Sequence, residues 1–149
     1  MRVTKTITFD AAHRLPSHPG ACRNIHGHTY RVDFTMRGEL NERGMVVDFG
    51  KVAQILRAVL VEDEDTAWDH ALIVYEHDPL AKTFQQLAAE GLRVRRVPAE
   101  PTAENMTEWL WQMLQGKLRD QEPSAVLVEI AVWETATSVA RYFGPQVLR

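Results

Sequence analysis

The sequence lacks the features that are typical of secreted or membrane-bound proteins. Cys22 is the single cysteine among 149 residues, so no disulfide can form within the chain. No apolar run approaches the length of a membrane span, and the opening stretch MRVTKTITFD contains no apolar signal core. The net charge of -3 gives no basic excess, so no nucleic acid or anionic membrane is expected as a partner. We expect a single domain over residues 1–149 in the reducing cytoplasm.

The chain also lacks repeats, low-complexity tracts and recognisable linkers, and alternation of apolar and polar residues is its clearest pattern. An alternation with period two is typical of a strand with one buried face. Three stretches have it, and we expect strands at residues 3–11, 28–37 and 125–134. In the last of them the apolar face is expected to run from Val126 to Val132.

Two further stretches have apolar residues at helical spacing. One follows Asp48 and the other follows Thr102, and both of these residue types are favoured N-caps. Trp111 lies off the apolar stripe of the second helix, which suggests contact with another subunit. A short helix, a short strand and a long connection complete the expected order, at residues 79–90, 92–97 and 61–81. We therefore predict an α+β fold, an antiparallel sheet with helices packed on one face.

Titratable side chains lie where the apolar faces of these strands end. If the alternation is unbroken by a β-bulge, His13 continues the apolar face of the first strand, and His26 and His28 begin that of the second. Three neutral imidazoles with one open position are the composition of a catalytic zinc site. The three histidines are therefore candidate zinc ligands. The alternative is that they are ordinary polar residues at strand ends.

The lone thiol precedes this histidine pair, since Cys22 stands four residues before His26. Three interpretations remain open. It is an inert buried thiol, a fourth ligand that closes a structural zinc site, or a thiolate that acts as a base or nucleophile beside the metal. The spacing alone does not decide between the last two.

Three other groups are candidates for acid–base chemistry or substrate binding. Asp69 and His70 are adjacent, and a carboxylate can fix the tautomer of an imidazole and support proton transfer. The alternative is a solvated loop pair. Glu134 ends the apolar face of the last strand, where its carboxylate can accept two N–H donors from a flat heterocycle. It could equally face solvent beyond the strand.

Taken together, six motifs resemble the tetrahydropterin synthases, in the family's order and over almost the whole chain. They are FDAAHRL at 9–15, CRNIHGHTY at 22–30, GMVVDF at 44–49, DH at 69–70, PTAEN at 101–105 and ET at 134–135. The step from Cys22 to His26 resembles the bacterial 6-carboxy-tetrahydropterin synthases of queuosine and other deazapurine synthesis. Animal 6-pyruvoyl-tetrahydropterin synthases have a longer insert there. The stretch 75–98 is longer here than in compact bacterial members.

The resemblance implies a tunnelling fold. Its four-stranded antiparallel sheet, with helices on one face, oligomerises into a barrel, and two trimers form a homohexamer with active sites between subunits. The implied site has zinc ligands, acid–base groups and a pterin-binding group that is also catalytic: His13, His26 and His28; Cys22, Asp69 and His70; and Glu134. Thr102 and the neighbouring backbone are implied as further pterin contacts.

The implied reaction converts 7,8-dihydroneopterin triphosphate to 6-carboxy-5,6,7,8-tetrahydropterin, with Zn2+ as cofactor and with release of triphosphate and acetaldehyde. One alternative is a reaction that stops at 6-pyruvoyl-tetrahydropterin. Another is a non-catalytic, zinc-stabilised binding domain with Cys22 as the fourth ligand, although such a domain would not need Asp69, His70 or Glu134.

Overall fold

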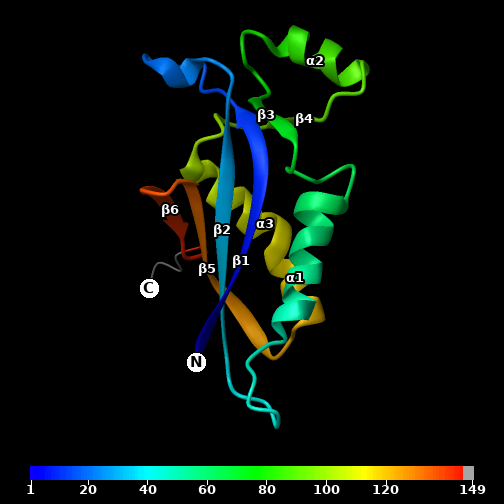
Figure 1. The fold of residues 1–149 in the computed structure, drawn as a ribbon, viewed down its shortest axis with the longest axis vertical. Helices are drawn as coiled ribbons and strands as arrows, with labels where there is room; N and C mark the ends of the chain where they lie inside the picture. The colour runs from blue at the N-terminus through cyan, green and yellow to red at the C-terminus, as the bar shows by residue number, and fades with distance from the viewer. Residues whose placement is uncertain (146–149) are drawn as a thin grey trace.

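The computed structural model describes residues 1–145, which form an α+β fold around one sheet (Figure 1). The sheet has six strands in the order β4-β3-β1-β2-β5-β6. The strands are β1 (Arg2–His13), β2 (His26–Gly38), β3 (Ala71–Tyr75), β4 (Val94–Val97), β5 (Ala125–Thr135) and β6 (Ser138–Tyr142). The helices are α1 (Phe49–Arg57), α2 (Ala81–Ala89) and α3 (Ala103–Gln121), with a 3-10 turn η1 (Ala21–Arg23) and a π-helical extension of α1, η2 (Ala58–Glu62).

The long hairpin of β1 and β2 follows the predicted alternation. Phe9 and Ala11 of β1 are buried, and so are Tyr30, Val32 and Phe34 of β2. These side chains form the core with the apolar faces of the helices. The period-two pattern predicted both strands because each of them buries only one face.

The expectation of four antiparallel strands was wrong, since the sheet has six strands and is mixed. β3 pairs in parallel with both β1 and β4. Its consecutive residues Ile73 and Val74 are both buried, so the strand has no alternation to detect, and the sequence analysis assigned it to a connection. β6, at the opposite edge, is short and largely exposed, which leaves a weak apolar pattern.

A β-bulge corrects the predicted face of β5. Thr35 pairs with Glu129 but the next residue, Met36, pairs with Leu127, so Val128 is an extra residue. The bulge reverses the alternation on its N-terminal side, and Val126 is 47% exposed instead of lying in the core. On the C-terminal side, Ile130 and Val132 are buried as expected.

The helices α1 and α3 begin where the capping residues predicted. The Asp48 side chain accepts from backbone N–H groups in the first turn of α1, and the Thr102 hydroxyl accepts from Asn105 N at the start of α3. α1 and α3 pack side by side on one face of the sheet, whereas α2 lies at one end against β4 (Figure 1). None of the helices within residues 1–145 combines the length and apolarity needed to cross a bilayer.

The sheet face turned away from α1 and α3 carries a polar network. Asp33 accepts hydrogen bonds from Thr6 Oγ1 at 2.6 Å, from Trp133 Nε1 at 2.9 Å and from the Arg31 guanidinium at 3.0 Å. Burial raises the pKa of Asp33, but these donors outweigh it and the pKa is lowered. This face is therefore organised by hydrogen bonds and ion pairs, although neither α1 nor α3 covers it.

Trp111 does not reach a subunit surface, contrary to the prediction. It is 7% exposed, and its ring packs edge-on against Tyr142 of β6 with 5.6 Å between ring centroids. Its Nε1 donates to Gln115 Oε1 at 3.2 Å. The prediction failed because the sequence did not reveal β6, the element that covers the indole.

The contact between Trp111 and Gly144 gives a test of this packing. Gly144 has φ +82, and a Cβ there would lie 2.6 Å from Cζ2 of the indole. Gly144→Ala should therefore add about 1–3 kcal/mol of overpacking to about 1–2 kcal/mol of left-handed strain. The measurement is the free energy of unfolding in urea.

Gly91→Ala is the matched control, because Gly91 has φ +93 but open space around its Cβ position. It should cost only the strain, about 1–2 kcal/mol. Equal losses in the two variants would contradict the close packing of Gly144 on Trp111.

Candidate active site

The hairpin of β1 and β2 brings three histidines together at its open end. His13 is the direct pairing partner of His26, and His28 lies on the same face of β2 two residues later. One ring nitrogen from each lies within 4.8 Å of the others. The structure thus assembles the set of imidazoles that the ends of the apolar faces predicted.

Backbone carbonyls orient two of the three rings. His13 Nδ1 lies 2.8 Å from Pro101 O, just before α3, and His26 Nδ1 lies 2.8 Å from Asn24 O. A carbonyl oxygen only accepts, so each Nδ1 carries the proton and each neutral ring has its lone pair on Nε2. These two Nε2 atoms are 3.0 Å apart. Two facing lone pairs at that distance fit a shared cation.

The third ring adds another nitrogen without a partner. Within residues 1–145, His28 Nε2 is buried and has no hydrogen-bond partner. In a tetrahedral zinc site with Zn–N distances of 2.0–2.1 Å, ligand nitrogens lie about 3.3 Å apart. The spacing of the His13 and His26 nitrogens is close to that value. The three residues therefore fit a zinc ion bound by imidazoles.

Burial favours the neutral form of two of these imidazoles, those of His13 and His28. It lowers the pKa of His13, although the hydrogen bond to Pro101 and the charge of Glu134 oppose the shift. It also lowers the pKa of His28, again against the charge of Glu134. Because a lower pKa keeps an imidazole neutral, both rings can offer lone pairs at neutral pH.

Glu134 lies beside the histidines, at the end of β5. Its Oε1 is 3.4 Å from His13 Nε2 and 3.8 Å from His28 Nε2. Its contacts with the two imidazoles place it on the face of Val132, as predicted, although the pairing of β5 with β6 has an irregularity between Trp133 and Thr135. Its carboxylate is 27% exposed and borders the open side of the cluster.

A cavity of about 210 Å³ adjoins this carboxylate and the first turn of α3. Thr102, Glu104, Leu15 and Glu134 are among the residues that line it. Thr102, the candidate pterin contact, lines it, and its hydroxyl accepts from Asn105 N. Glu104 is a functional candidate that the sequence analysis missed, since its place in a helical first turn already explained an acidic residue.

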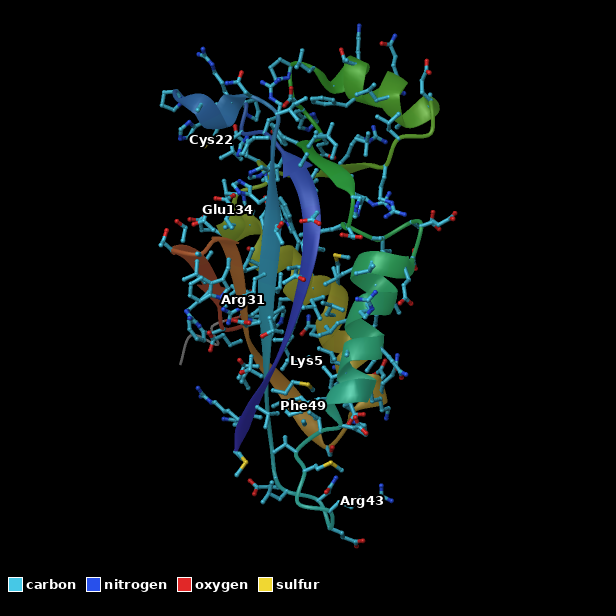
Figure 2. All side chains as sticks on the ribbon, in the orientation of Figure 1. Lys5, Cys22, Arg31, Arg43, Phe49 and Glu134 are labelled. Atoms are coloured by element: carbon cyan, nitrogen blue, oxygen red, sulfur yellow. The ribbon has the colours of Figure 1, made fainter. Side chains whose placement is uncertain are left out.

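Cys22 lies on η1 at the same end of the molecule as Glu134 (Figure 2). Its carbonyl accepts from Leu15 N at 2.9 Å, which ties η1 to a residue that lines the cavity. Its thiol is partly buried and does not belong to the group of converging ligand atoms found within residues 1–145. The arrangement within one chain therefore leaves the histidine cluster with an open position.

Asp69 and His70 form a tight pair, but on the other face of the sheet. Asp69 Oδ2 accepts from His70 Nδ1 at 2.8 Å, and its Oδ1 accepts from Asp10 N at 3.0 Å. His70 has a positive φ of 55, and its side chain is 75% exposed. Its backbone N–H donates to Asp10 O at 2.6 Å, so the strained residue is held against β1.

His70 of this pair borders the larger of the two cavities at this end, about 550 Å³ in volume. Asp10, Thr29, His70 and Arg93 are among the residues that line it, and His28 of the histidine cluster is another. Asp10 and Thr29 alternate with His13 and His28, so their side chains lie on the opposite face of the sheet from the imidazoles. The structure does not bring His70 and the histidine cluster of the same chain to one face.

Comparison with known proteins identifies similar chains. The model of a protein family described as 6-pyruvoyl tetrahydropterin synthase matches residues 2–145. A Haemophilus influenzae protein named 6-carboxy-5,6,7,8-tetrahydropterin synthase is 30% identical over 145 residues, which cover 95% of this chain and 97% of that protein.

Two solved structures share the fold. One, from Wolinella succinogenes, has a TM-score of 0.78 at 22% identity and is matched over 97% of this chain and 98% of its own. The other is 6-pyruvoyl tetrahydropterin synthase of Caenorhabditis elegans, with a TM-score of 0.67 at 25% identity over 97% of this chain and 96% of its own. Both align over nearly the whole length, so the entire described chain has the architecture of that fold.

Proposed function

The chain belongs to the 6-pyruvoyl tetrahydropterin synthase family, and from this we propose that it is a zinc-dependent 6-carboxy-tetrahydropterin synthase. The proposed reaction converts 7,8-dihydroneopterin triphosphate to 6-carboxy-5,6,7,8-tetrahydropterin, with release of triphosphate and acetaldehyde. The observation that carries the proposal is the convergence of His13, His26 and His28 beside a cavity that contains Glu134. The name of the Haemophilus influenzae relative supports the carboxy product, and we assign the product to queuosine or other deazapurine synthesis by resemblance.

The protein's own residues supply binding and proton transfer. A zinc ion held by the three imidazoles would supply Lewis acidity toward the side-chain oxygens of the substrate. Glu134 accepts N–H donors of the pterin and fixes its position, and Thr102 borders the same cavity. Cys22, as a thiolate, accepts a proton from the substrate side chain. Asp69 holds His70 through Nδ1, which leaves Nε2 to carry a proton.

The position of His70 requires a second copy of the chain in this proposal. Since Asp69 and His70 lie on the opposite face of the sheet from the imidazoles of their own chain, they would serve the zinc site of a neighbouring subunit. A homohexamer of two trimers, with its sheets joined into a barrel, is the assembly that we propose. The edge strands β4 and β6 are available for such joining.

Two alternatives make different predictions at the same site. The reaction could stop at 6-pyruvoyl-tetrahydropterin, which differs in the product and not in the metal. The other is a structural zinc site closed by Cys22. The thiol's position outside the converging ligand group and the carboxylate of Glu134 beside the cluster both favour an open metal site.

The central test combines product analysis with one substitution. The purified protein should contain about one zinc per chain, and mass spectrometry should detect 6-carboxy-tetrahydropterin formed from 7,8-dihydroneopterin triphosphate. Cys22→Ala should keep the zinc and the melting temperature but lower turnover roughly a hundredfold, because it removes only an acid–base group.

His26→Ala is the matched variant and should lose zinc as well as turnover. A Cys22→Ala protein without zinc would establish the closed structural site instead. A pyruvoyl product from the wild-type protein would establish the first alternative.

Glu134 provides a second test, because two carboxylates line the small cavity. Glu134→Gln should weaken the binding of 7,8-dihydroneopterin, the substrate without its triphosphate, by about tenfold or more, since charge-assisted hydrogen bonds are lost. Calorimetry measures the affinity, and the zinc content should not change.

Glu104→Gln is the comparison. Unchanged affinity in Glu134→Gln together with a loss in Glu104→Gln would transfer the pterin-binding role to Glu104.

Mixed oligomers test the shared site. His28→Ala and His70→Ala should each be inactive, but co-expression of the two chains should restore roughly a quarter of the wild-type activity, because one site in four combines intact groups from neighbouring chains. The assay is turnover of the purified mixed assembly. Co-expression of His28→Ala with His26→Ala is the control and should restore none, because both changes damage the same cluster. No recovery in the first mixture would contradict sharing.

A further inference from the structure

The large cavity beside His70 contains one arginine, Arg93, in an otherwise mainly apolar wall. Arg93 immediately precedes β4. Leu92, its neighbour in the sequence, and Leu72 of β3 are apolar residues of the same cavity wall. A half-buried guanidinium in such a wall loses hydration and needs an acceptor.

Only part of that need is met within the chain. Arg93 Nη1 donates to Asp69 O at 2.6 Å, a neutral acceptor. The arginine ion pairs found within residues 1–145 involve other arginines. One N–H is therefore used to fix the side chain, and the remaining donors of the guanidinium are available to the cavity.

The neighbouring carboxylates are already occupied by other donors. Asp69 accepts from Asp10 N and His70 Nδ1, and Asp10 Oδ1 accepts from Thr29 Oγ1 at 2.5 Å. A second guanidinium, that of Arg95, is not among the lining residues; burial and then the charge of Arg93 lower its pKa, against the charges of Asp65 and Asp63. Arg95 itself donates to the carbonyls of Ala67 and Glu64. The wall thus contains one guanidinium, that of Arg93, which forms no ion pair with a carboxylate within residues 1–145, and one carboxylate, that of Asp10, which is bonded to Thr29.

The other cavity has no cationic side chain among the described residues that line it. Glu104 and Glu134 both line it, so a polyanion there would meet two carboxylates. A pterin triphosphate has a flat head with N–H donors and a tail with several negative charges. The head suits the cavity with the carboxylates, and the tail suits the cavity with the guanidinium.

We propose that Arg93 is a specificity-determining residue that binds the triphosphate tail of the substrate at the shared site, beside His70 of the same chain. This inference rests on the proposed function and assembly, in which one chain supplies the zinc cluster and its neighbour supplies the Asp69–His70 pair. The bond from Arg93 to Asp69 O places the tail-binding group and the proton-transfer pair at a fixed separation. Binding of the tail therefore also positions the side chain of the substrate at His70.

The first test removes the charge and uses the zinc-loaded wild-type assembly as reference. Arg93→Gln should raise KM for 7,8-dihydroneopterin triphosphate about tenfold or more, and should weaken binding of inorganic tripolyphosphate by a similar factor in calorimetry. Affinity for 7,8-dihydroneopterin, which has no phosphate, should be unchanged. Arg93→Lys should recover part of the loss, because it restores the charge without the planar fork.

Arg96→Gln is the matched control, since it removes the same charge from an exposed position that alternates with Arg95 on β4. It should change neither KM nor tripolyphosphate binding by more than about twofold.

A second pair of variants keeps the contact between Arg93 and Asp69, in case its loss unfolds the loop. Leu92 is 53% exposed and lines the same cavity. Leu92→Glu adds a negative charge there, and Leu92→Gln adds the same shape without charge. Tripolyphosphate should bind at least fivefold more weakly to Leu92→Glu than to Leu92→Gln, a difference that shrinks at high salt.

The outcomes separate this inference from the proposed function. A wild-type enzyme that turns over the pterin substrate but does not bind tripolyphosphate would overturn the role of Arg93, and so would wild-type KM values in both Arg93→Gln and Leu92→Glu. A protein that binds neither pterin nor zinc would overturn the proposed function. In that case tripolyphosphate binding still tests Arg93 alone.

Discussion

The antiparallel register of β1 and β2 is the constraint on which the rest of the candidate site depends. It places His13 directly opposite His26 and puts His28 on the same face. A slip of one residue would turn every side chain of β2 to the other face. It would bury Arg31 and Asp33 in place of Tyr30 and Val32, so the core prevents it. The packing of the hydrophobic core therefore sets the geometry of the imidazoles.

The start of α3 also orients the imidazole of His13. The Pro101 carbonyl accepts from His13 Nδ1, and the next residue, Thr102, caps the helix. The start of α3 therefore fixes the position of this carbonyl. His13 is 1% exposed and cannot exchange this partner for water. The tautomer that turns its Nε2 toward the cluster is thus fixed by the start of a helix far away in the sequence.

How much of this could be predicted from the sequence depends on how many faces each element buries. The alternation gave the position of β1 and β2 because one face of each is exposed, and local capping chemistry gave the starts of α1 and α3. β3 was not predicted because it has buried residues on both faces, and β6 was not predicted because it is a short edge strand. Without β6, the burial of Trp111 could not be predicted either. The bulge at Val128 depends on its pairing partners in β2, which no local pattern contains. The histidines and Glu134 were found because each ends an apolar face on the regular side of that bulge.

The same alternation that identified the zinc ligands also separates them from the acid–base pair. Side chains of neighbouring residues in a strand point to opposite faces. Asp69 is bonded to the backbone of Asp10, and its partner His70 borders the cavity on the face of Thr29. His13 and His28 lie on the helix-covered face. A side chain cannot pass through a hydrogen-bonded sheet. If both groups act in one reaction, the reaction needs two copies of the chain, and the need for assembly follows from the pleat of the strand itself.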